Sequence, residues 1–199
     1  MSFAIETERL ILRDIEEADF PYLLDHFTNP SGLDNVLSHQ SNEAFVRWLI
    51  MAAIATAKQQ PRQHYILAVT LKPEQTVIGN CMLIDAEPES IKANIGWNII
   101  NAYEGQGYAT ETAHRLLALG FETNEVTRIY ADCFAYNRAS IRVMEKIGMT
   151  PNRNGLLRRW WRSLRYSERR PIVRHQLWRE QWLSLNSRTD SSRASGSEG

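Results

Sequence analysis

Apolar residues recur at a helical spacing in the first part of the chain. Residues 9–13 form a short apolar stretch that predicts a strand, and the acidic run 14–19 favours the start of a helix that ends near Phe27. After a loop over 29–41, Ser41 or Asn42 can cap a longer helix. In that helix apolar residues lie three and four positions apart, at Phe45, Trp48, Leu49, Ala52 and Ala53. We therefore expect this apolar face to be buried.

From Pro61 onward the spacing changes to that of strands. Residues 65–71, 77–84 and 91–99 predict three strands in an antiparallel meander. A helix over about 110–122, a strand over 128–134 and a helix over about 138–146 follow, and Gly148 ends the last helix. A helix that connects two strands implies local parallel pairing, so we expect an α/β (α+β) fold with a mixed central sheet and helices on both faces.

The composition is that of an ordinary globular protein. The chain has 199 residues, 43% hydrophobic and 23% charged, which fits one domain and excludes wholesale disorder, collagen and coiled coil. The net charge is zero, but residues 1–125 hold 8 basic and 17 acidic side chains, whereas residues 126–199 hold 15 and 6. A basic C-terminal third therefore faces an acidic N-terminal part, and the net charge predicts no general affinity for polyanions.

The cysteines and the chain ends add expectations about the environment. Cys81 and Cys133 are too few for a disulfide scaffold or a zinc site, and we expect both to be buried in strands in a reducing cytosol. No signal-peptide pattern opens the chain, and no apolar run approaches the ~20 residues that span a bilayer, so we predict a cytoplasmic protein without membrane contact. We assign 1–183 to one domain and 184–199 to a disordered polar tail.

The segment 95–111 contains the most informative local pattern. A strand end, a turn with Gly105 and Gly107, and a helix that begins near Ala109 or Thr110 follow one another directly. Exposed amides at a helix start attract anions, and glycines let a phosphate approach the backbone closely. The segment lacks the third glycine of a dinucleotide fingerprint and the Lys-Ser/Thr of a Walker loop. It therefore predicts either a pyrophosphate cradle or a tight turn without a ligand.

Several motifs in order resemble those of the GNAT superfamily of acetyl-CoA-dependent N-acetyltransferases. They are Ile95-Gly96-Trp97, the run 105–111, Arg128-Ile129, the run 137–140 and the run 143–149. The segment 7–13 near the start of the chain and the predicted strand segment 77–80 are similar to the branch that includes the ribosomal-protein N-terminal acetyltransferases. The resemblance covers roughly residues 5–182.

The resemblance implies a GNAT fold with a splayed strand pair at the cofactor cleft, acetyl-CoA as cosubstrate and no metal. The strand at Trp97, Asn98 and Ile99 would pair with the pantetheine arm, and the amides of Gln106, Gly107, Tyr108, Ala109 and Thr110 would hold the pyrophosphate. Asn137 would bind the pantetheine or its thioester end, cap a helix, or do both. Ser140 would protonate the leaving thiolate.

Three positions depart from the pattern of the family. Met144 stands where many members have a tyrosine acid, which makes Ser140 the better candidate. The branch often has an acidic residue where this chain has Asn94, and the segment 157–162, where some ribosomal-protein enzymes have a glutamate, contains no carboxylate. Asp85, His39 and His64 are candidate bases, and the plainer interpretation is that they are exposed loop residues. An α-amine with a pKa of about 7.7–8.0 is partly neutral near pH 7.5, so a water relay could suffice.

The segment 153–179 holds nine arginines together with several aromatic residues and one glutamate, Glu168. This composition suits contact with RNA near the substrate. Two alternatives stay open: a last hairpin whose arginines point outward, and recognition of a substrate carboxylate.

We predict a cytosolic acyltransferase, an N-acetyltransferase that moves the acetyl group of acetyl-CoA directly to a primary amine, namely the N-terminal α-amine of a protein, as in the ribosomal-protein enzymes. A second candidate acceptor is a small amine such as an amino acid, polyamine or antibiotic. The rival from another class is a non-catalytic acyl-CoA-binding module.

Overall fold

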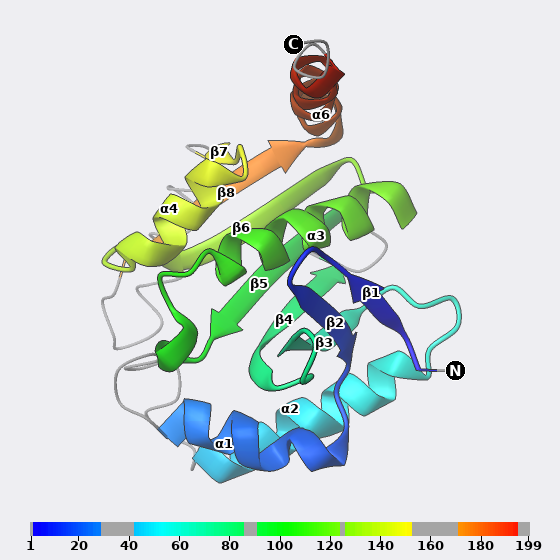
Figure 1. Cartoon of the computed structure of the whole chain (residues 1–199), viewed down its shortest axis with the longest axis vertical. Helices are drawn as coiled ribbons and strands as arrows, with labels where there is room; N and C mark the ends of the chain where they lie inside the picture. The colour runs from blue at the N-terminus through cyan, green and yellow to red at the C-terminus, as the bar shows by residue number, and fades with distance from the viewer. Residues whose placement is uncertain (1, 29–41, 86–90, 124–125, 153–170, 195–199) are drawn as a thin grey trace.

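An eight-stranded sheet forms the centre of the molecule (Figure 1). This computed structural model describes residues 2–28, 42–85, 91–123, 126–152 and 171–194. The strand order is β1-β2-β3-β4-β5-β6-β8-β7, and the β5–β6 pair is parallel while its neighbours pair antiparallel. The strands are β1 (Ala4–Glu6), β2 (Leu10–Asp14), β3 (Tyr65–Leu71), β4 (Val77–Asp85), β5 (Lys92–Ile99), β6 (Arg128–Phe134), β7 (Thr150–Pro151) and β8 (Ile172–Trp178). The predicted mixed sheet is confirmed.

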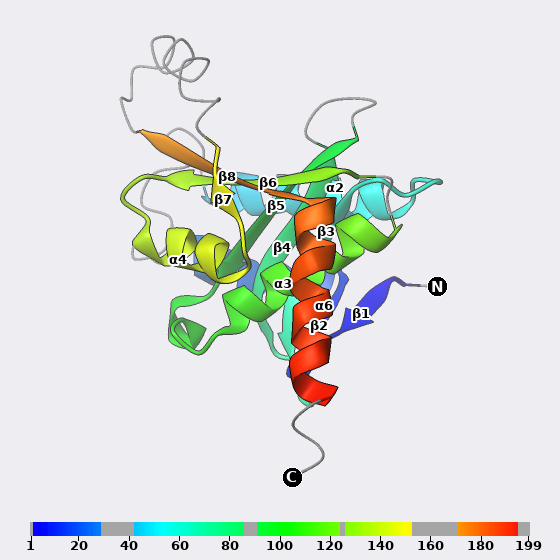
Figure 2. The same ribbon diagram turned by 90° about the horizontal axis from the view of Figure 1, so that it is seen from above.

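Helices cover both faces of this sheet, as predicted. On one face lie α1 (Phe20–Thr28) and α2 (Asn42–Ala57), and on the other α3 (Tyr108–Thr123) and α4 (Arg138–Lys146) (Figures 1 and 2). The last helix, α6 (Arg179–Ala194), follows β8 directly and projects from the body of the molecule (Figure 2). Two short 3-10 turns, Glu17–Asp19 and Asn101–Tyr103, precede α1 and α3. None of the helices in the described ranges is long and apolar enough to cross a membrane.

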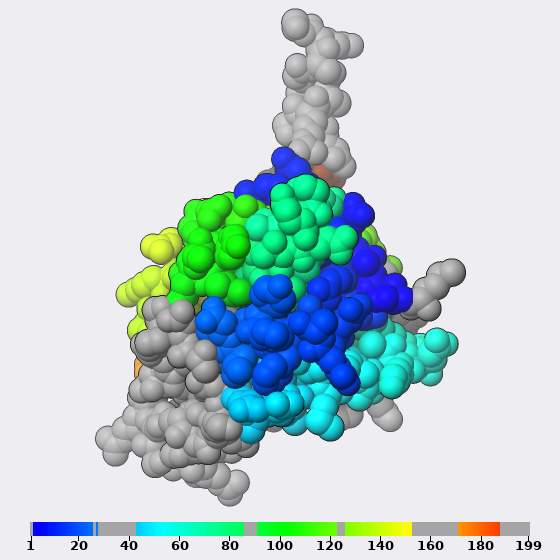
Figure 3. All heavy atoms as spheres, turned by 60° about the horizontal axis from the view of Figure 1, so that its bottom comes forward, coloured from blue at the N-terminus to red at the C-terminus, as the bar shows by residue number. Residues whose placement is uncertain are grey.

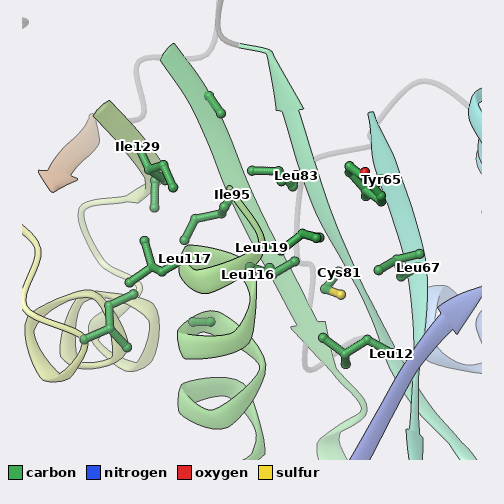
Figure 4. Close-up of a cluster of buried hydrophobic side chains, with 14 of the residues drawn as sticks. Leu12, Tyr65, Leu67, Cys81, Leu83, Ile95, Leu116, Leu117, Leu119 and Ile129 are labelled. Carbon is green, nitrogen blue, oxygen red and sulfur yellow. The ribbon is translucent and has the colours of Figure 1, made fainter. Parts of the chain in front are cut away.

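Alternation along the strands builds a separate core on each face. In β3, Leu67 and Val69 belong to the larger core beneath α3, and Ala68 belongs to the smaller core beneath α1 and α2. Figure 4 shows strand side chains of the larger core, among them Leu83 and Ile95, directed toward leucines of α3. Because both faces are covered, the central strands are nearly continuous apolar runs.

The predicted buried face of α2 is wrong at Trp48, whose side chain is 60% exposed. Leu49 and Ala53 are buried as predicted, and the buried face is completed by Val46 and Ile50, so that its residues also recur at spacings of three and four. Two overlapping helical faces were available in this apolar sequence, and packing against α1 and β3 selects the one centred on Leu49. Trp48 lies beside it and contacts the ring of Phe45, with 5.8 Å between centroids.

The end of the chain also differs from the expectation, because residues 184–194 lie in α6 and not in an irregular tail. The Trp182 ring packs on Phe121 with 5.4 Å between centroids, and the Arg179 guanidinium donates to the carbonyl of Phe121. At the start of the helix, Gln181 Oε1 accepts from the amide of Trp178 at 3.2 Å. These contacts fix the first turns of a helix that has no apolar periodicity of its own. The assignment of residues 1–183 to one domain stays a prediction, and residues 195–199 lie outside the described residues.

Candidate active site

The sheet opens between its two parallel strands, β5 and β6. Pairing joins Lys92–Asn94 to Arg128–Tyr130, and no further pairs between these strands are present in the described residues. On their outer sides both strands stay paired to the end, since Ile99 pairs with Gly79 and Phe134 with Ile172. The backbone of residues 95–99 therefore presents an unpaired edge to the opening, as the resemblance implied.

A cavity of about 370 Å³, called the first cavity here, lies where this opening meets the start of α3. Its lining combines the end of β5, the glycine turn, the first turn of α3 and one face of α4. Of the residues predicted to bind the cofactor, all but Gln106 line it: Trp97, Asn98, Ile99, Gly107, Tyr108, Ala109, Thr110 and Asn137. Residues of distant sequence position are thus brought together as predicted.

The glycine turn has the conformation that an anion cradle needs. Gly105 and Gly107 have φ angles of 75° and 87°, a region that residues with a Cβ rarely adopt. The amide of Glu111 already bonds to the carbonyl of Gly107 at 3.0 Å, so the amides of Tyr108, Ala109 and Thr110 precede the bonded part of the helix. These donors and the helix dipole favour negative charge in the first cavity.

Basic residues that the sequence analysis did not assign extend this cavity. Arg142 and Lys146 of α4 line it, and Lys146 also lines a shallow groove beside Thr7 and His114 that continues from the first cavity. Their spacing of four residues puts both on one side of α4. The sequence signal was therefore present, since Arg138, Arg142 and Lys146 form a basic stripe.

A partly buried carboxylate connects the start of α3 to the turn that precedes β2. Glu111 accepts from the Thr7 hydroxyl at 2.6 Å, from the Arg9 amide at 2.8 Å and from Arg9 Nε at 2.7 Å. Burial acts to raise the pKa of Glu111, but the hydrogen bonds from Thr7 and Arg9 outweigh it, and the pKa lies below its ordinary value. Glu111 is therefore ionised at neutral pH and holds the turn rigidly.

Arg9 completes this connection by reaching over the turn. Its Nη1 donates to the carbonyl of Gln106 at 3.0 Å, and its guanidinium lies 4.5 Å from the centre of the Tyr108 ring. Gln106 thus contributes a carbonyl to the support of the turn, although it does not line the first cavity. Sequence reasoning missed the role of Arg9 because its partner Glu111 is 102 residues away.

A second cavity, of about 340 Å³, lies on the other side of the opening. Its walls are mainly aromatic and aliphatic, and come from α1, α2, β4, β5, β6, α4 and the start of β8. The two cavities share four lining residues, which we call the junction: Trp97, Asn98, Asn137 and Ser140. The opening in the sheet therefore connects two differently lined cavities at one point.

Two polar residues of the junction come from the start of α4. Asn137 is the N-cap of this helix, and its Oδ1 accepts from the Ser140 amide at 3.0 Å. The cap uses the oxygen of the side chain and leaves its Nδ2 group for a ligand. One helical turn further, Met144 is fully buried and lines the second cavity, so no tyrosine hydroxyl is present at that position.

Two of the predicted bases, Asp85 and His64, lie in the described residues, and neither is at the junction. Asp85 ends β4 and pairs with Ala93, four positions from the Cys81–Trp97 pair, and it lines neither cavity. His64 Nε2 lies 3.5 Å from Asp85 Oδ2, so these two candidates face each other away from the opening. His39 lies outside the described residues, as does the segment 157–162.

The arginine-rich segment is described only in part, because residues 153–170 lie outside the described ranges. In the described part, Arg174 bonds Asp132 through Nε–Oδ1 and Nη2–Oδ2 contacts of 2.7 and 2.5 Å. No contact in this described part indicates binding of RNA or of a substrate carboxylate, and both stay predictions.

The two cysteines differ in environment. Cys81 is fully buried, and burial raises the pKa of its thiol. Cys133 is only half-buried and lines the second cavity, so the expected burial is confirmed for Cys81 alone. The described residues contain no group of three or more His, Cys, Asp or Glu side chains that could hold a metal ion.

Comparisons with known proteins agree with this geometry. The profile of the acetyltransferase (GNAT) domain family matches residues 9–150. The uncharacterized N-acetyltransferase YnaD of Bacillus subtilis is 28% identical over 170 residues, which cover 82% of this chain and 95% of YnaD.

Solved structures share the fold. A GNAT-family acetyltransferase from Bacillus anthracis superposes with a TM-score of 0.71 at 24% identity, covering 89% of this chain and 99% of the other. RimL, a ribosomal L7/L12 alpha-N-protein acetyltransferase solved in complex with coenzyme A, has a TM-score of 0.68 at 17% identity and covers 88% of this chain and 98% of its own.

Proposed function

The chain belongs to the family of GNAT acetyltransferase domains and is an N-acetyltransferase, and we propose that it transfers the acetyl group of acetyl-CoA to the α-amine at the N-terminus of a protein. The observation that carries the proposal is the meeting of the two cavities at the junction. A donor in one cavity and an acceptor in the other would face each other there, which is the arrangement that direct transfer requires.

The first cavity fits the donor. Its helix-start amides would hold the pyrophosphate, and Arg142 and Lys146 would add positive charge beside it. A Cβ at Gly107 would lie 3.4 Å from Arg9 Nη2 in a strained conformation, so only glycine leaves the backbone open there. The unpaired edge of residues 95–99 would pair with the amides of the pantetheine arm.

At the junction, the neutral amine attacks the thioester carbonyl carbon. A C–N bond forms, the C–S bond breaks, and the acetylated amine loses a proton to water while the coenzyme A thiolate leaves. We assign Ser140 to a hydrogen bond toward the leaving sulfur and the Nδ2 group of Asn137 to the orientation of the thioester. No covalent intermediate on the protein is needed.

The charges around the junction favour an α-amine over a lysine side chain. The described carboxylates that line the cavities are Glu104 in the first and Asp132 in the second, and Asp132 is bonded to Arg174. None of the four junction residues is an acid or a base. An α-amine, with a pKa of about 7.7–8.0, supplies neutral nucleophile near pH 7.5, whereas lysine, at about 10.4, needs a base. The shared fold with RimL supports the same acceptor class.

The test offers acetyl-CoA with three kinds of acceptor: peptides with a free α-amine, the same peptides blocked at the α-amine but carrying lysine, and small amines such as spermidine, amino acids and kanamycin. Mass spectrometry would locate the acetyl group, and calorimetry would measure acetyl-CoA binding. We expect transfer to the free α-amine.

Faster transfer to a small amine would contradict the proposed acceptor and favour the second candidate. Acetyl-CoA binding without transfer to any amine would overturn the enzyme assignment and favour a binding module. The cytosol as the place of the reaction stays part of this proposal.

A further inference from the structure

The second cavity is lined mainly by aromatic and aliphatic side chains, which transfer of an acetyl group does not itself require. We propose that the acceptor presents an aromatic or large aliphatic group next to its reacting amine, and that this group fills the second cavity. For a protein acceptor, the first residue would then be apolar. This inference rests on the proposed function, because it assigns the acceptor to that cavity.

Aromatic rings from three elements contribute to the cavity wall. Phe27 of α1 and Phe45 of α2 meet edge to face, with centroids 5.0 Å apart, and both line the cavity. Phe134, at the end of β6, also lines the cavity and stacks on Tyr136 with centroids 5.3 Å apart. Rings arranged in this way offer both faces and edges to another ring or to a branched aliphatic chain. Figure 3 turns the face formed by α1 and α2 toward the viewer.

Methionines in the described lining can adapt their shape to a bound group. Met82 of β4 and the buried Met144 of α4 contribute thioethers, whose unbranched side chains adjust to the group they contact. Gly96 lies opposite Met82 in the sheet, and a Cβ there would come within 3.0 Å of Met82 Cε. The absence of a side chain at Gly96 thus leaves the methionine its place in the cavity.

Among the described lining residues, polar side chains other than the Trp97 indole and the Cys133 thiol lie in two places. Asn98, Asn137 and Ser140 lie at the junction, where the amine would react. Asp132 is the one carboxylate among the described lining residues, and its charge is offset by Arg174. A polyamine or aminoglycoside, with several positive charges, would find no unpaired carboxylate among the described residues of the lining. The pattern matches a molecule with an amine at one end and an apolar body.

The volume sets a limit on the size of that body. An apolar cavity of about 150 Å³ holds a benzene ring. The second cavity, at about 340 Å³, therefore has room for one phenylalanine or leucine side chain and part of the adjoining backbone. A longer chain would have to leave through the open side.

The first test compares peptides that differ only at their first residue. We expect kcat/KM for Phe and Leu to exceed that for Ser by about 10- to 100-fold, because burying a large apolar side chain favours binding by that factor. An equal or higher value for Ser, or for spermidine, would overturn the inference.

Variants connect the preference to the cavity. Met82→Asp places a charge in the lining, and we expect it to remove most of the preference for Phe over Ser. Met51→Asp is the matched control, because Met51 is 71% exposed on α2 and lines neither cavity. If Met82→Asp fails to fold by circular dichroism, Phe134→Ala at the half-exposed rim replaces it. Retained preference in a folded cavity variant would contradict the assignment.

A binding measurement separates this inference from the proposed function. Saturation-transfer NMR with coenzyme A present would compare N-acetyl-phenylalaninamide with N-acetylserinamide, and needs no turnover. Preferential binding of the phenylalanine product without transfer to any peptide would support the cavity assignment and overturn the proposed function. Transfer to peptides with no preference for an apolar first residue would support the proposed function and overturn the cavity assignment.

Discussion

Single residues of the glycine turn decide whether the donor can approach the backbone. Gly107 has a φ angle of 87° and lies beside the amides that we assign to the pyrophosphate. The substitution Gly107→Val should lower the affinity for acetyl-CoA by more than about 10-fold. The new side chain would occupy the position assigned to the phosphate, and valine would strain the turn at this φ angle. Isothermal calorimetry measures this effect.

Gly148→Val is the matched control, since Gly148 has a φ angle of 84° but lies against Leu185 of α6, away from both cavities. Both variants should lose thermal stability, and only Gly107→Val should lose affinity. Unchanged affinity in folded Gly107→Val protein would remove the turn from the donor site.

Ser140 offers a second test, because its change to alanine removes a single hydroxyl group. Its hydroxyl is assigned to the leaving thiolate, while its backbone amide is bonded to the Asn137 cap and is kept in any variant. Ser140→Ala should therefore lower kcat by about 10²-fold or less and leave acetyl-CoA affinity unchanged. Ser184→Ala, on exposed α6, controls for the loss of a helical hydroxyl. A kcat equal to that of the wild type, with chemistry rate-limiting, would leave Ser140 a lining residue only.

The sequence predicted the residues whose position depends on local order and missed those that depend on register. Asn137 and Ser140 could be placed because a helix start fixes both at once. Asp85 was expected beside the cleft, but the antiparallel register pairs it with Ala93, toward the other end of β5. The residues of β4 alone do not reveal this register, because the register follows from the pairing of β4 with β5.

At the scale of elements, the start of α3 depends on its connection to β2. Glu111→Gln should lower acetyl-CoA affinity by about 10-fold or less and reduce the melting temperature, because it removes the charge that bonds Arg9. Since its pKa lies below the ordinary 4.5 in the folded state, Glu111 stabilises the fold above that pH, and the effect is lost as the pH falls further.

Glu122→Gln is the control on the same helix, because Glu122 is mostly exposed and lies 3.9 Å from Arg115. Thermal melts at pH 7 and pH 4 would compare the two variants. Equal behaviour of both would show that the connection to β2 does not position the turn.

Strands β3 to β6 and helices α3 and α4 were predicted from periodicity, because each has a clear apolar pattern and a turn or glycine at its end. The opening between β5 and β6 was implied by the family resemblance alone. In physical terms it depends on the competing pairs of β4 and β8, which hold the two strands apart, and no residue within β5 or β6 encodes that distance. The three-residue β1 was too short to leave a pattern.

At the scale of the whole molecule, the two candidate bases in the described residues, Asp85 and His64, line neither cavity, and this has a kinetic consequence. For a peptide α-amine, log(kcat/KM) should rise with unit slope and level off near pH 8, at the pKa of the acceptor itself. Asp85→Asn and His64→Gln should give the same profile as the wild type, because these residues contact each other and line neither cavity. A further inflection between about pH 5 and 7 that one of these variants abolishes would show that a base operates.

The fold as a whole serves to bring two cavities of different chemistry to one opening in a sheet. The first has amides and cations at its phosphate end. In the second, the described lining is mainly aromatic and aliphatic, and its polar side chains lie at the junction and at Asp132, which is paired with Arg174. The family resemblance predicted most of the residues that bind the donor, but the second cavity could not be derived from the sequence, since its lining comes from seven elements. Because the two cavities meet at the junction, an acetyl group could pass there directly from donor to acceptor.

A crystal structure of the protein with coenzyme A and an N-acetylated phenylalanine peptide tests this central claim most directly. The account predicts the pyrophosphate on the amides of residues 107–110, the sulfur within about 4 Å of Ser140 Oγ, and the phenylalanine ring in the second cavity. The acetyl group would then lie at the junction. Coenzyme A bound away from the glycine turn, or the peptide bound outside the second cavity, would contradict it.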